Sequence, residues 1–198
     1  MNVNRLVVTI DATHQSLQQR LDTAMHHATT LSRPRDTYVR TDAFMAATSR
    51  HLAAVDEALL DAVGHRLLDG PEKVKSYLHQ ARLLEHAISH LKARLYGEVH
   101  AAHLPWSQVW DDVRRELLAH NRLERELVGE LAEVLDEAAC GALADKVYRA
   151  EVKAPTRAHP NIPHSGLVGH LARRLWAIAD RFWDTAESRQ VPPPVRPH

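Results

Sequence analysis

Several residue types are scarce in this chain, and each scarcity excludes a class of protein. Cys140 is the one cysteine among 198 residues, which excludes an intrachain disulfide, a cysteine-based zinc site and an iron–sulfur cluster. Neither sign of charge is in excess, because 25 Lys and Arg balance 25 Asp and Glu, so no net field attracts nucleic acid or anionic lipid. No apolar stretch approaches the ~18 residues of a membrane span, and the first residues lack the pattern of a signal peptide. We therefore expect a cytoplasmic protein with neither a membrane nor a nucleic-acid partner.

Histidine, in contrast, is abundant. The chain has 15 histidines against seven glycines, two phenylalanines and four tyrosines. Some of these histidines follow no common pattern along the chain. Others occur where the neighbouring residues predict a buried helix face, and these are the candidates for a function.

Helix-breaking residues divide the chain into helical segments. Gly70 followed by Pro71, and Pro105 after Leu104, mark sharp joints between helices, and only Leu6–Ile10 hints at a strand. Helices are predicted over residues 11–32, 41–69, 71–97, 105–138 and 166–188. We therefore predict an all-α protein, an up-down-up-down four-helix bundle with an additional C-terminal helix. Its parts are the bundle in 1–152, a Pro-rich connection in 153–166, an accessory helix that packs on the bundle in 167–189, and a flexible tail in 190–198.

The helix predicted over 105–138 gives the clearest signal of a site. Its core-facing stripe follows alternating three- and four-residue steps: Val109, Val113, Leu117, Leu127, Leu131 and Val134. His120 and Glu124 lie in the same register, so an imidazole and a carboxylate point into the interior together. Burying an ionised carboxylate costs several kcal/mol unless a partner neutralises it, and a metal ion is the usual partner.

The other long helices also carry histidines. His14 opens the apolar stripe of the helix over 11–32, and His51 lies within the stripe of 41–69. His86 and His90 are four residues apart, the spacing of a two-histidine metal clip on one helix face. This pair lies nearly opposite the best apolar stripe of its helix, namely Leu78, Ala81, Leu84, Ile88, Leu91 and Leu95. The pair can be interior only if the accessory helix covers that second face.

The order of these residues resembles a known family. Along the chain they run His14, His51, His86-x-x-x-His90 and His120-x-x-x-Glu124. This order is similar to that of the hemerythrin and HHE cation-binding family. The segments DATHQSLQQRLDTAM, LLEHAISHLKARL and LLAHNRLERELVGEL also resemble that family's first, third and fourth helices. The resemblance covers roughly residues 10–138.

The resemblance implies a non-haem iron centre of five histidines and two carboxylates. It carries two irons in the complete form, and one iron if a ligand is missing. The family's second-helix glutamate is replaced here by Val55, which leaves Asp56 or Glu57 as the second carboxylate ligand. By the same resemblance the centre binds dioxygen, nitric oxide, peroxide or iron itself, with peroxide decomposition in a stress response as an expected activity.

Two other interpretations stay open. The first is a DinB-like bundle in which three histidines hold one divalent metal for a thiol-dependent transfer. The second is a metal-free helical interaction protein whose histidines are structural. His159 and His164, in the Pro-rich connection, either approach the site or belong to a stiff linker.

Overall fold

The computed structural model describes residues 4–29, 34–97, 104–154 and 193–196. Within these ranges the chain is helical and contains no strand. The helices are α1 (Arg5–Thr29), α2 (Pro34–Ala58), α3 (Leu60–Arg66), α4 (Gly70–Tyr96), α5 (Trp106–Val134) and α6 (Glu137–Lys153). The prediction of an all-α protein is therefore confirmed for this part of the chain. The predicted accessory helix over 166–188 lies outside the described residues.

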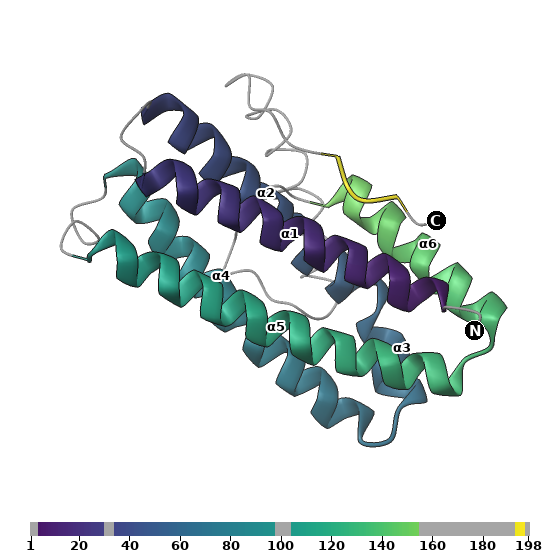
Figure 1. Ribbon diagram of the computed structural model, residues 1–198. Coiled ribbons are helices and arrows are strands. Elements are labelled where there is room, and N and C mark those ends of the chain that lie inside the picture. The colour runs from purple at the N-terminus through teal and green to yellow at the C-terminus, as the bar shows by residue number, and fades with distance from the viewer. Residues whose placement is uncertain (1–3, 30–33, 98–103, 155–192, 197–198) are drawn as a thin grey trace.

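The long helices lie alongside one another around a common apolar interior (Figure 1). α4 packs along α5, α5 along α1, and α1 along α2. α6 lies against α2 and α1, and the short α3 lies mainly against α4. Within the described ranges, no helix has an apolar stretch of the length that crosses a membrane.

Several helix ends differ from the predicted ones. The second long helix starts before the predicted residue 41, because Pro34 is the first residue of α2, a position where its missing N–H and fixed φ are tolerated. The hint of a strand at Leu6–Ile10 was wrong, because this segment belongs to α1 and its end residues, one helical turn apart, are buried on the same face.

Two joints fix where α4 and α6 begin. Asp69 adopts a left-handed conformation (φ 53°), and a Cβ on Gly70 would come within 2.5 Å of the carbonyl oxygens of Val63 and Gly64. Only glycine therefore fits where α4 starts against α3. Asp136 caps α6 by accepting a hydrogen bond of 2.7 Å from the backbone N–H of Ala139. The predicted single helix over 105–138 consequently ends at Val134, and α6 turns back toward α2.

Candidate metal centre

Three histidines from three helices converge on one carboxylate oxygen. Oε2 of Glu124 lies 3.5 Å from Nε2 of His14, 3.2 Å from Nε2 of His51 and 3.0 Å from Nε2 of His120. His14 comes from α1, His51 from α2, and His120 with Glu124 from α5. One ligand atom from each of His14, His51 and Glu124 lies within 4.8 Å of the others, the spacing needed to hold one metal ion.

The helix registers explain why these side chains point inward. On α5, the predicted stripe residues Val109, Val113, Leu117, Leu127 and Leu131 are buried, and only Val134, at the helix end, is exposed. His120 and Glu124 continue that stripe and are completely buried. His14 precedes the buried Leu17 and Leu21 on α1, and His51 is followed one turn later by the buried Val55 on α2. The interior placement predicted for these four ligand candidates is thus observed.

The close packing of these groups changes their protonation. Burial by itself would lower the pKa of His51, but the charges of Glu124 and Glu151 and the hydrogen bonds to both raise it to about 10. Burial would raise the pKa of Glu124, but the nearby His51 and His14 and the contact with His120 hold it well below its usual value. Burial lowers the pKa of His120. Without a metal, the cluster therefore combines an ionised Glu124 with an imidazolium at His51.

Glu151 of α6 is a member of the cluster that the sequence analysis missed. Its Oε1 lies 2.9 Å from Nδ1 of His51, and its side chain is buried. Nε2 of His51 faces Glu124, and the Glu151 carboxylate contacts the other ring nitrogen, Nδ1. A signal for Glu151 exists in the sequence, because it follows the buried Cys140, Ala144 and Val147 at steps of four, three and four residues.

Tyr77 of α4 was also missed. It is buried, its ring centroid lies 5.1 Å from that of His120, and its hydroxyl has no hydrogen-bond partner among the described residues. Burial, followed by the charges of Glu124, Asp56 and Glu85, raises the pKa of Tyr77 well above its usual value. The phenol is therefore neutral and adjoins the histidine cluster on the α4 side. Its position one turn before the buried Ala81 could have identified it.

The structure does not bring the remaining predicted ligands into the cluster. His86 and His90 are exposed on α4, with their ring centroids 6.2 Å apart. The physical reason is the apolar stripe of α4, whose residues Leu84, Ile88, Leu91 and Leu95 are buried and turn the opposite face outward. Asp56 is partly buried, and Glu57 is exposed. The described residues thus bring together four of the eight ligand candidates.

The donor set fits a divalent transition metal. Within the described part of the chain, both ring nitrogens of His14, both of His120 and Oε1 of Glu124 are buried and form no hydrogen bond of good geometry. Each buried polar group without a partner costs about 1–3 kcal/mol. A cation between His14, His51 and Glu124 would use a lone pair of each, and His120 lies beside the same carboxylate oxygen at 3.0 Å. Imidazole with carboxylate suits iron, zinc, copper and nickel.

Comparisons with protein-family models, with curated proteins and with solved structures give no match to this chain. The hemerythrin-like resemblance therefore stays a prediction. The metal-binding interpretation instead depends on the contacts between His14, His51, His120 and Glu124.

Proposed function

We propose that this chain is a non-haem metal protein of hemerythrin-like type that holds one iron ion and binds a small ligand there. Its framework is an up-down-up-down four-helix bundle of α1, α2, α4 and α5, with α6 as an additional helix. His14, His51, His120 and Glu124 are the proposed ligands. The observation that carries the proposal is the convergence of three imidazole Nε2 atoms, 3.0–3.5 Å away, on one buried carboxylate oxygen.

One ion is proposed because the described residues supply one complete ligand set. The resemblance implies two irons, but a second iron would need the pair His86 and His90, which faces outward. Three neutral imidazoles and one carboxylate leave a divalent ion with net positive charge and with coordination positions free for a small molecule. Bound there, iron would supply the redox and Lewis-acid chemistry that dioxygen, nitric oxide or peroxide requires. The choice of iron over zinc rests on the family resemblance.

The protein contributes orientation and exclusion of water. Glu151 accepts the Nδ1–H of His51 in this proposal, which directs the Nε2 lone pair of the same ring toward the ion, as carboxylate–histidine–metal triads do. His51, His120 and Glu124 are nearly inaccessible to solvent, so a ligand would enter a dry site. The neutral hydroxyl of Tyr77, beside His120, is a hydrogen-bond donor available to such a ligand.

Elemental analysis of protein purified without a metal-affinity tag tests the proposal. We expect about one iron per chain and an absorption spectrum that changes when azide or peroxide is added. His120→Ala and Glu124→Ala should each lower the iron content severely, because each removes a ligand from the buried set. Full iron content in both variants would contradict the proposed site. Two irons per chain, lost in a His86→Ala/His90→Ala variant, would instead support a di-iron centre.

A metal-free structural role is the second candidate, and one observation favours it. His51 lies between Glu124 and Glu151 at 3.2 and 2.9 Å, so its imidazolium can neutralise the cluster without any ion. The two candidates differ in their response to chelation. A bound ion at a thousand times its Kd stabilises the fold by about 4 kcal/mol, so chelation should lower the thermal midpoint strongly. An unchanged midpoint would favour the structural role.

A further inference from the structure

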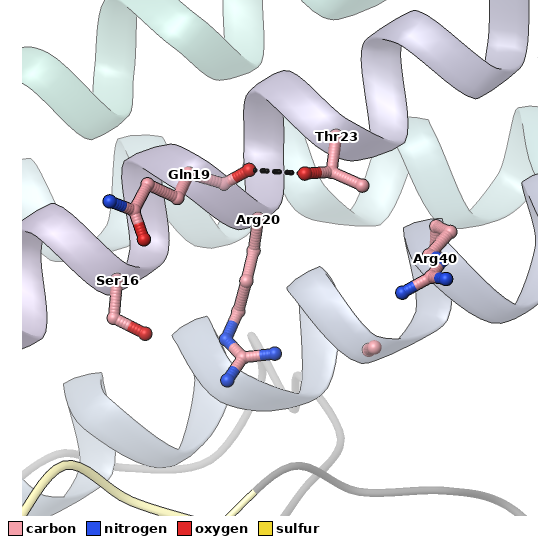
Figure 2. Close-up of a pocket in the computed structure, with 6 residues that line it drawn as sticks. Ser16, Gln19, Arg20, Thr23 and Arg40 are labelled. Atoms are coloured by element: carbon pink, nitrogen blue, oxygen red, sulfur yellow. Dashed lines mark hydrogen bonds between the residues drawn. The ribbon is translucent and has the colours of Figure 1, made fainter.

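A second polar site lies between α1 and α2, separate from the histidine cluster. It is a groove of about 260 Å³ whose walls are Ser16, Gln19, Arg20 and Thr23 of α1 with Arg40 and Ala43 of α2. Figure 2 shows the guanidinium groups of Arg20 and Arg40 extending into the space between the two helices. The groove is therefore lined by two cations and several hydrogen-bonding side chains.

The positive charge of this groove is not neutralised within the described part of the chain. No described Asp or Glu forms an ion pair with Arg20 or Arg40. The two aspartates of α1, Asp11 and Asp22, are already paired at 2.7 Å with arginines of α5. The groove therefore presents two guanidinium groups that no carboxylate of the described residues pairs with, and an external anion can bind to them.

The surroundings of Arg20 make its positive charge less favourable. Arg20 is partly buried, and this burial lowers its pKa. Arg50 of α2 is buried nearby. Burial lowers the pKa of Arg50, and the charge of Arg20 lowers it further, whereas the charge of Glu151 raises it. The charges of Arg20 and Arg50 repel each other beside the groove, and Glu151 offsets this on the Arg50 side, so negative charge bound next to Arg20 would be favourable.

The chemistry of the lining specifies the kind of anion. Each guanidinium presents a planar fork of N–H donors, the geometry that binds phosphate or carboxylate oxygens in pairs. Ser16 and Gln19 add a hydroxyl and an amide, while the Thr23 hydroxyl already donates to the backbone carbonyl oxygen of Gln19 at 2.7 Å. Two positive charges match a phosphate group, which carries about −1.5 to −2 at pH 7, better than a single carboxylate. We propose that this groove binds a phosphate group, either as inorganic phosphate or as a phosphomonoester.

Isothermal titration calorimetry on the full chain tests this proposal, with inorganic phosphate and glycerol 3-phosphate as probes at constant ionic strength. Saturable binding to one site is expected. Arg20→Gln should weaken that binding at least about tenfold, because a charge-assisted hydrogen bond contributes about 1.5–3 kcal/mol. Arg20→Lys keeps the charge but loses the fork, and should weaken binding less. Tighter binding of glycerol 3-phosphate would favour a phosphomonoester as the occupant, and tighter binding of inorganic phosphate would favour the free ion.

Arg82→Gln is the matched control, because Arg82 is an exposed arginine of α4 whose loss removes the same charge far from the groove. It should bind phosphate as the unchanged chain does. Metal content is measured in each variant, so that phosphate bound at the metal centre is recognised. If Arg20→Gln disturbs the fold, Arg40→Gln at an exposed position replaces it, and about a tenfold loss is again expected. Absence of saturable binding, or equal weakening by Arg82→Gln and the groove variants, would overturn the proposal.

Discussion

Two pairs of candidate ligands in this molecule share their helical spacing but have opposite environments. His120 with Glu124 on α5, and His86 with His90 on α4, are both pairs four residues apart. The first pair is completely buried and contacts two further histidines, whereas the second pair is exposed. The difference arises from the register of each pair relative to the apolar stripe of its own helix. A metal-ligand spacing therefore indicates a buried centre only when the pair continues that stripe.

The largest expected effect is a loss of stability when Glu124 is removed from the buried histidine cluster in metal-free protein. Glu124→Ala would leave the imidazolium of His51 with one carboxylate partner instead of two. Removing one member of a buried ion pair costs about 3–5 kcal/mol, so we expect a fall of this size in the free energy of unfolding. Urea unfolding after treatment with a chelator measures it.

The control for this comparison is Glu57→Ala, which removes an exposed carboxylate from α2. Its effect should stay within about 0.5 kcal/mol, as for most surface substitutions. Equal losses in the two variants would show that the interior cluster does not stabilise the fold.

The role of Glu151 sharpens the comparison, because within the described part of the chain His86 and His90 have no carboxylate contact equivalent to that of Glu151 with His51. Glu151→Gln keeps the size of the side chain but removes its charge beside His51. Loss of such a supporting partner typically weakens metal binding 10–100-fold, and we expect a loss in this range with the metal still bound at saturation. Competition with a chelator of known affinity measures it, and unchanged affinity would assign Glu151 a structural role alone.

The all-helical class and the interior placement of half of the candidate ligands could be predicted from the sequence, because both depend on helix register. His14, His51, His120 and Glu124 were identified as interior from their apolar neighbours, and the structure buries all four. Glu151 was missed because it lies on α6, beyond the segment that resembles the family. The way in which α6 packs on α1 and α2 is a tertiary contact that no local pattern specifies.

The pair His86 and His90 shows a case in which two signals in the sequence disagree. For His86 and His90, the order of motifs in the family favoured a ligand role, while the apolar stripe of α4 placed them outside. The structure agrees with the stripe, since Leu84 and Ile88 face the interior. Burial of apolar side chains fixes how a helix is rotated about its axis. This rotation decides whether a histidine pair on the helix faces the interior or the solvent. Residues 166–188, which were expected to cover the pair, lie outside the described part of the chain.

Raising the pH should reduce the stability that the charged His51 contributes to metal-free protein. The folded pKa of His51 is about 10 and its unfolded value about 6.5, so its contribution is fully present below pH 6.5 and is lost as the pH rises through 10. The pKa values of Glu124 and His120 are lowered, so neither group titrates in this upper range. Chemical unfolding between pH 7 and 10 should show stability falling with pH, and His51→Gln should reduce this slope. A slope equal in both proteins would contradict the ion pairing of His51.

The smallest effect is expected from the exposed group. A His86→Ala/His90→Ala variant removes two side chains from the solvent-facing side of α4, where neither contributes to the core. We expect a change in the free energy of unfolding within about 0.5 kcal/mol for each substitution, because alanine also favours the helix. Its iron content and the chelator-induced fall in its thermal midpoint should equal those of the unchanged chain. If the double variant instead loses metal, a second ion must be bound where α4 faces away from Glu124, and burial would no longer distinguish the two groups.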